Sequence, residues 1–280
     1  MENKTNLSYG TDAQQKYDVY FPETPNKAAV IVVHGGGWWQ GDMGKESKVP
    51  DRLAAEGYLV FVPNYRLAQG IDAEGKRLSA KGRDREENLF PTQAMDLTTF
   101  VSHIRASSDY SFETLGAFGS SSGGNLVTEL AVREGLPAVS WSGLVDFDAF
   151  YAHNVTTKVK KKMIKADTAS ADIDQDGSDD PYYKWCLMNL VGGEVSKIHE
   201  ASPLSRVTKT TGPMYLAVSM NELVHTYEVK HLTKILLKND VEVRTQYLAG
   251  TRHAEAYYDD AIEPSLAFLK HYLLDLPAKK

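Results

Sequence analysis

The feature that most constrains the fold of this chain is an alternation of short apolar runs with segments of helical periodicity. Seven apolar runs lie at positions 17–21, 28–33, 58–62, 115–119, 138–141, 214–219 and 241–247. Most are nearly continuous stretches of Val, Ile, Leu, Phe and Tyr, as is typical of strands covered on both faces in a parallel sheet. Only the run 241–247 alternates apolar with polar residues, so we expect that strand nearer an edge.

Between the runs, apolar residues recur at the spacing of one helix face. They occur at positions 97, 101 and 104, at 229, 232 and 236, and at 262, 266, 269 and 273. Each set predicts an amphipathic helix that packs against the sheet. Strands alternating with helices over this length predict an α/β fold with right-handed crossovers.

One region, at about 146–202, interrupts this alternation and contains no clean strand. It holds the basic run KVKKKMIK (158–165) and the acidic run DIDQDGSDD (172–180). A plain loop of that length is uncommon in a compact domain. We therefore expect one domain, 1–280, with a mostly helical cap inserted over the functional edge of the sheet.

Composition excludes several classes of function. Hydrophobic residues make up 42% and charged residues 24%, values typical of a soluble globular protein. The net charge of −6 argues against nucleic acid or an anionic membrane as the main partner. The single cysteine, Cys186, excludes an intramolecular disulfide. No secretory signal and no apolar run of about 20 residues is visible, so we expect a cytoplasmic protein that acts on a small molecule, with homo-oligomerisation left open.

The stretch GSSSG at 119–123 fits the pattern G-x-S-x-G, with Ser121 at its centre. A strand candidate precedes it and a helical pattern follows it, which is the context of a nucleophile elbow. In such an elbow a sharp turn exposes the serine hydroxyl, and the helix N-terminus places N–H groups near the developing negative charge. The sequence therefore predicts Ser121 as a nucleophile.

The stretch HGGGWW, which follows the run 28–33, fits the same chemistry. Consecutive glycines leave backbone N–H groups that a ligand can approach closely. We expect the N–H groups of Gly36 and Gly37, with that of Ser122 after the nucleophile, to form an oxyanion hole. His34 and Trp38 of this stretch are our candidates for the substrate pocket, although either could instead order the loop or pack beneath it.

A serine nucleophile needs a base, and the sequence offers eight histidines. His253 follows the last strand candidate and precedes the final helix, which is the expected position in the chain order Ser, acid, His. It is therefore the predicted base.

Taken in order, the stretches HGGGW, VPNYRLA, FPTQAMDL and GSSSGGNL resemble the hormone-sensitive-lipase-like branch of the α/β-hydrolases. This resemblance extends from about residue 17 to 274. It implies an α/β-hydrolase fold, with Ser121 as nucleophile, His253 as base and the oxyanion donors named above. Bacterial short-chain acyl and acetyl esterases belong to that branch.

The third member of the triad departs from the family. Where relatives read D-x-L-V-P after the seventh strand, this chain reads NELVH, with Asn221 in place of Asp. Three alternatives are open: Glu222 reaches the histidine with its longer side chain, Asn221 orients it through the amide oxygen, or Asp146 serves from a neighbouring strand end. We favour Glu222 or Asn221.

These residues predict a serine carboxylesterase that needs no metal or organic cofactor. The resemblance implies that its substrates are short-chain, acetyl-like esters. An aryl formamidase of the same fold is one alternative. A non-catalytic ligand-binding protein with a decayed triad is another, and Asn221 favours it. The start of the acidic run, DIDQDG, resembles a calcium loop but has Tyr183 where an EF-hand has Glu, so we expect a solvated loop and no metal site.

Overall fold

In the computed structural model of the protein, which describes residues 3–44, 48–162 and 179–276, the described chain is built around an eight-stranded sheet. The order of strands across the sheet is β1-β2-β4-β3-β5-β6-β7-β8. Strands β3 to β8 run parallel, and β1 and β2 pair antiparallel to their neighbours. The strands are β1 (Lys4–Ser8), β2 (Lys16–Tyr20), β3 (Ala28–Val33), β4 (Leu59–Pro63), β5 (Thr114–Ser120), β6 (Ala138–Trp141), β7 (Met214–Ser219) and β8 (Val243–Leu248).

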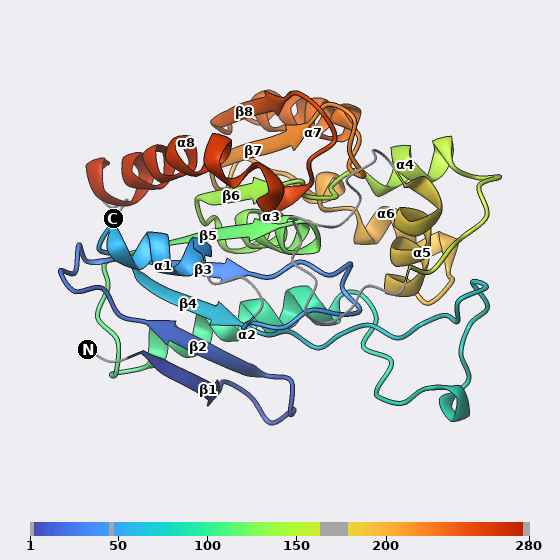
Figure 1. Cartoon of the computed structure of the whole chain (residues 1–280), viewed down its shortest axis with the longest axis horizontal. Coiled ribbons are helices and arrows are strands. Elements are labelled where there is room, and N and C mark those ends of the chain that lie inside the picture. Colours follow the sequence, from blue (N-terminus) through green and yellow to red (C-terminus); the bar gives the residue numbers. More distant parts are fainter. Residues whose placement is uncertain (1–2, 45–47, 163–178, 277–280) are drawn as a thin grey trace.

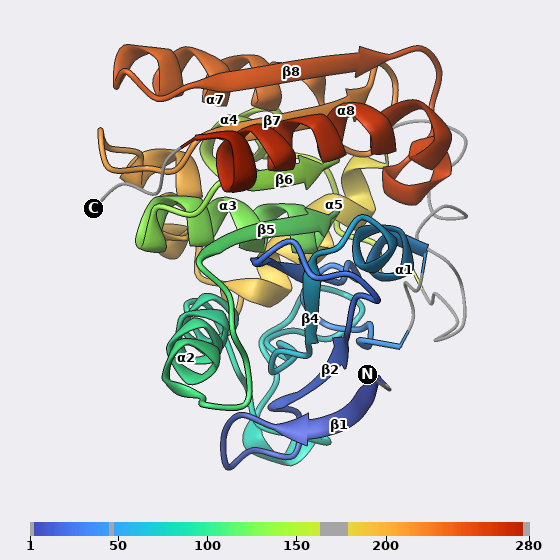
Figure 2. The same ribbon diagram turned by 90° about the vertical axis from the view of Figure 1, so that its left-hand side faces the viewer.

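Helices connect these strands and cover the sheet on both sides (Figure 1). Figure 2 shows the sheet twisting from β8 at the top to β1 at the bottom, as expected because each strand has a right-handed twist. The α-helices are α1 (Lys48–Ala55), α2 (Thr92–Ala106), α3 (Ser122–Glu134), α4 (Phe147–His153), α5 (Asp180–Leu190), α6 (Ile198–Ala201), α7 (Thr226–Lys238) and α8 (Tyr258–Lys270).

The two faces of the sheet support separate hydrophobic cores, because side chains alternate along a strand. On β3, Ala29, Ile31 and Val33 belong to the core that contains the buried residues of α2, α3 and α7. The intervening residues of β3 belong to the core that contains α1 and α8. Every residue of β3 is buried, which explains why its sequence is an unbroken apolar run.

The seven predicted strands and the three predicted helix faces are confirmed, with ends shifted by a residue or two. The expectation that the alternating run at 241–247 lies near an edge is also confirmed, because β8 is the last strand of the sheet. The sequence analysis missed β1, at the opposite edge. Its sequence KTNLS is exposed at four of five positions and gives no apolar signal.

Two connections extend beyond the carboxyl ends of the parallel strands (Figure 1). The first joins β6 to β7, carries α4, α5 and α6, and is helical in much of its described part. The second joins β4 to α2 through the short 3-10 turn Ala80–Gly82. The expected cap boundaries at 146–202 remain a prediction, and most of the acidic run lies outside the described residues.

Candidate active site

Ser121 occupies a sharp turn between β5 and α3. Its backbone angles are φ 55° and ψ −125°, a conformation that a non-glycine residue adopts only when its surroundings enforce it. The neighbouring glycines allow the turn to form. A Cβ at Gly119 would lie 2.4 Å from the carbonyl oxygen of Gly123, and one at Gly123 would lie 2.1 Å from that of Val33. The G-x-S-x-G pattern is thus a steric requirement of this turn.

The glycine stretch forms a loop after β3 with unusual backbone angles. Gly36, Gly37 and Trp38 have φ values of 120°, 60° and 63°. A Cβ at Gly36 would lie 2.1 Å from the carbonyl oxygen of Gln40, and one at Gly37 would lie 2.7 Å from the Cys186 sulfur. Side chains are therefore excluded at both glycines for lack of space as well as by conformation.

The structure corrects the expected roles of His34 and Trp38 as pocket residues. Trp38 is fully buried beneath the loop, and its indole N–H donates to Asn125 Oδ1 on α3 over 3.1 Å. His34 is 1% exposed and stacks on Tyr65, with ring centroids 4.4 Å apart. Both side chains hold the loop against the core instead of lining the pocket.

His253 and Glu222 form a buried pair. Both side chains are inaccessible to solvent, and the Nδ1 atom of His253 contacts the Oε2 atom of Glu222. The other carboxylate oxygen, Oε1, accepts hydrogen bonds from the backbone N–H of Ser219 and the hydroxyl of Ser142, each over 2.7 Å. Because a carboxylate can only accept, the shared proton belongs to Nδ1, which makes Nε2 the acceptor nitrogen of the imidazole.

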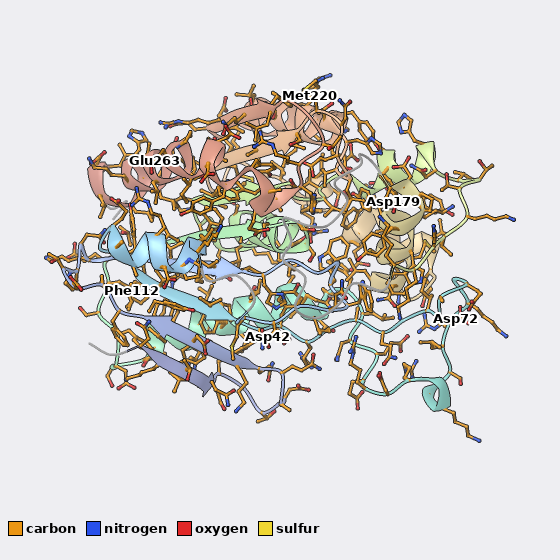
Figure 3. The ribbon with its side chains drawn as sticks, in the orientation of Figure 1. Asp42, Asp72, Phe112, Asp179, Met220 and Glu263 are labelled. Carbon is orange, nitrogen blue, oxygen red and sulfur yellow. The ribbon has the colours of Figure 1, made fainter. Side chains whose placement is uncertain are left out.

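The two other candidates for the acid lie elsewhere. The side chain of Asn221 is exposed, and its backbone N–H donates to the carbonyl oxygen of Gly250. Figure 3 shows the preceding residue, Met220, at the outer edge of the molecule. Asp146 caps α4 and binds His231 Nδ1 over 2.6 Å. Of the three alternatives, the structure places Glu222 against the histidine.

A small cavity adjoins Ser121, Gly36 and Gly37. Its volume is about 10 Å³, which is room for roughly one water molecule. Its other walls are residues that the sequence analysis did not single out, since their apolar and aromatic character looks like that of any core position. They are Leu144, Tyr182, Tyr183, Cys186 and Leu223.

The wall that α5 contributes is uncharged and held in place. Burial raises the pKa of the Cys186 thiol to about 12, so the sulfur acts as an apolar group. Tyr183 stacks on Phe150 with centroids 3.7 Å apart, and its hydroxyl donates to Glu228 Oε2 over 2.8 Å. Burial in turn raises the pKa of Glu228 to about 8, so this carboxyl group is mostly neutral at pH 7.

A second, larger cleft adjoins Trp39, Gln40 and Gly41, which follow the glycine stretch. It has a volume of about 520 Å³, and its lining includes Trp39, Trp185, Arg85 and Lys161. The two indoles meet edge to face with centroids 5.0 Å apart, and the Lys161 ammonium lies 4.5 Å from the Trp39 ring. Arg85 donates to the carbonyl oxygen of Trp39, and burial lowers its pKa. The cleft thus combines aromatic surface with hydrogen-bonding groups.

In the described ranges, no three His, Cys, Asp or Glu side chains gather in a way that could hold a metal ion. The stretch DIDQDG (172–177), which we expect to be a solvated loop, lies outside those ranges. The helices within the described ranges include none with the length and apolarity to cross a bilayer.

A protein-family comparison matches residues 17–236 to the family BD-FAE. No curated protein matches the chain. Several solved structures share its fold at low sequence identity. Esterase B from Lactobacillus Rhamnosis is 17% identical with a TM-score of 0.68, and the match covers 97% of this chain and 84% of that one.

Two further structures give similar values. A truncated carbohydrate esterase from gut microbiota is 16% identical with a TM-score of 0.68, over 96% of this chain and 97% of that one. An acetyl ester-xyloside bifunctional hydrolase from Caldicellulosiruptor lactoaceticus is 15% identical with a TM-score of 0.64, over 92% and 87%. At these identities the likeness shows the fold alone.

Proposed function

Because this chain belongs to the BD-FAE family of α/β-hydrolase esterases, we propose that it is a serine carboxylesterase acting on short-chain esters. The observation that carries the proposal is the buried Glu222–His253 pair. It supplies the acid that the sequence lacks at Asn221, and a decayed site has no reason to keep a buried carboxylate against a histidine. The pair therefore favours an enzyme over a non-catalytic binding protein.

In the proposed mechanism, Ser121 Oγ attacks the ester carbonyl carbon while His253 Nε2 takes the hydroxyl proton. Glu222 holds the Nδ1 proton and stabilises the imidazolium that forms. The N–H groups of Gly36, Gly37 and Ser122 bind the carbonyl oxygen as it becomes negative, where one donor is worth about 3–4 kcal/mol. His253 then protonates the leaving alcohol, and water hydrolyses the acyl-enzyme by the same steps in reverse order.

The size of the cavity beside Ser121 supports a small acyl group. A volume of about 10 Å³ leaves room for a methyl group but not for a longer alkyl chain. We therefore propose acetyl-like esters as substrates, with the leaving alcohol directed to the open side of the serine.

An aryl formamide is the second candidate substrate, because a formyl group needs even less room than an acetyl group. The aromatic surface of Trp39 and Trp185 in the neighbouring cleft favours a leaving group that contains a ring. This candidate uses the same nucleophile and base, so it differs only in the bond that is cleaved.

The test compares p-nitrophenyl acetate, p-nitrophenyl butyrate and an aryl formamide as substrates of the wild type and of Ser121→Ala. We expect acetate to be hydrolysed faster than butyrate, and Ser121→Ala to show only the background rate. Preference for the formamide would select the second candidate. Equal, background-level rates for both proteins on all three substrates would refute serine hydrolysis.

A further inference from the structure

The carboxyl end of β6 lies between the strands that carry the proposed nucleophile and the proposed acid. The carbonyl oxygen of Trp141, its last residue, accepts a hydrogen bond from the N–H of Ser121 over 2.8 Å. The next residue, Ser142, donates its own N–H to the carbonyl oxygen of Ala217 on β7 over 2.8 Å. Two consecutive residues thus join the nucleophile turn to the strand that precedes Glu222.

The hydroxyl of Ser142 extends these contacts to the remaining parts of the site. It lies 2.7 Å from Glu222 Oε1 and 2.7 Å from the Tyr257 hydroxyl, and it accepts the N–H of Ala254 over 3.0 Å. The direction of these hydrogen bonds follows from the partners. The Glu222 carboxylate can only accept and the Ala254 N–H can only donate, so the Ser142 hydroxyl donates its proton to Glu222. Tyr257 therefore donates, either to Ser142 or to the carbonyl oxygen of Ala217 at 3.1 Å.

The backbone at this position is strained. Ser142 is fully buried and has a φ of 48°, and Ala254, which its hydroxyl contacts, has a φ of 52°. A left-handed conformation is unfavourable for a non-glycine residue, and such residues concentrate at functional sites. Glycine would relieve the strain at 142 but would remove the hydroxyl.

We propose that Ser142 is a positioning residue for the hydrolysis, a role that rests on the proposed function. Its hydroxyl fixes one oxygen of Glu222, so that the other oxygen faces His253. Through the N–H of Ala254 it also fixes the residue that follows His253. One side chain thereby sets both partners of the acid–histidine pair.

The identity of the acid explains why such a residue is needed. Glutamate has one more rotatable bond than aspartate, so a glutamate carboxylate has more orientations to lose. The backbone N–H of Ser219 donates one hydrogen bond to Oε1 of Glu222. Ser142 adds a second donor to the same oxygen, and two donors define both the position and the plane of the carboxylate.

The experiment measures kcat, KM and the pH profile of p-nitrophenyl acetate hydrolysis for the wild type, Ser142→Ala and Ser142→Gly. The glycine variant fits the backbone conformation, so its loss of activity cannot be attributed to added strain. The matched control is Ser140→Ala on β6, two residues before Ser142, which removes another buried hydroxyl; that hydroxyl donates to the carbonyl oxygen of Gly124 over 2.9 Å.

We expect kcat to fall by up to about 100-fold in both Ser142 variants, because a small misplacement of catalytic groups has effects of this size. We expect KM to stay unchanged and the acid limb of the kcat/KM profile to move to lower pH, since the imidazolium loses part of its carboxylate contact. Ser140→Ala should keep the wild-type kcat and profile.

A second readout does not depend on turnover. The proton shared by His253 Nδ1 and Glu222 should give a downfield NMR resonance in the wild type, and it should weaken or move in Ser142→Gly. Wild-type kcat, pH profile and resonance in both Ser142 variants would overturn the proposal, as would an equal loss in Ser140→Ala. An inactive wild type that retains a Ser142-dependent resonance would instead count against the proposed function alone.

Discussion

Replacing Glu222 with glutamine keeps the size of the side chain and exchanges one carboxylate oxygen for an amide nitrogen. The structure determines which oxygen is exchanged. Both the Ser142 hydroxyl and the Ser219 N–H donate to Oε1 over 2.7 Å, so the amide oxygen has to occupy that position. The amide NH₂ group then faces His253 Nδ1.

This orientation reverses the imidazole tautomer. Facing a donor, Nδ1 has to accept, and the proton moves to Nε2. In the proposed mechanism Nε2 must be unprotonated to take the proton of Ser121. A wrong tautomer of this kind lowers turnover by about 10⁴-fold in the Asp-to-Asn variant of a serine protease, which corresponds to roughly 5.5 kcal/mol of activation free energy. We expect a loss of that order for Glu222→Gln.

The assay is the initial rate of p-nitrophenyl acetate hydrolysis, with Ser121→Ala defining the background. Urea unfolding of each variant separates loss of catalysis from loss of the fold. The matched comparison is Asn221→Asp, which places an aspartate at the exposed position where the family resemblance leads us to expect the acid. We expect Asn221→Asp to leave the wild-type rate unchanged and to give no rescue when combined with Glu222→Gln.

Two results would refute this reasoning. One is a Glu222→Gln variant that folds and keeps a rate within tenfold of the wild type. The other is recovery of activity in the double variant, since it would mean that position 221 faces His253.

Three further predictions follow from buried contacts. Trp38→Phe leaves Asn125 Oδ1 without its indole donor, so the free energy of unfolding in urea should fall by about 1–3 kcal/mol. Glu228→Gln should remove a pH dependence of the folding stability. The pKa of Glu228 is raised from 4.5 to about 8, so the wild type binds a proton on folding and loses stability as pH rises between those values. Thermal unfolding at pH 9 should therefore show the glutamine variant to be more stable than the wild type. Leu223→Ala enlarges the cavity beside Ser121, so the ratio of butyrate to acetate hydrolysis should rise; an unchanged ratio would count against this cavity as the acyl site.

Most of the architecture could be predicted because its signals are local. Buried parallel strands require apolar side chains on both faces, and the run AAVIVV of β3 displays that requirement directly. The turn at Ser121 could also be predicted from the sequence, since Gly119 and Gly123 lie where a Cβ would collide with the backbone. The edge strand β1 gave no such signal, because four of its five residues are exposed and none needs to be apolar.

The glycine loop shows where local reasoning reaches its limit. Its conformation could be inferred from three consecutive glycines, but the directions of His34 and Trp38 could not. Trp38 turns inward because Asn125, on a helix far along the chain, offers a buried acceptor. The sequence does not distinguish a loop tryptophan that lines a pocket from one that packs beneath the loop and supports it.

The sequence by itself determined the α/β class and the predicted roles of Ser121 and His253, because the elbow and the order of residues along the chain are properties of short segments. Only the tertiary structure shows that the side chain of Glu222, and not that of Asn221 or Asp146, lies against His253. That arrangement depends on which way the turn after β7 directs each side chain and on contacts among residues 142, 219, 222 and 253. Such contacts join segments far apart in the chain, and no spacing within one segment encodes them.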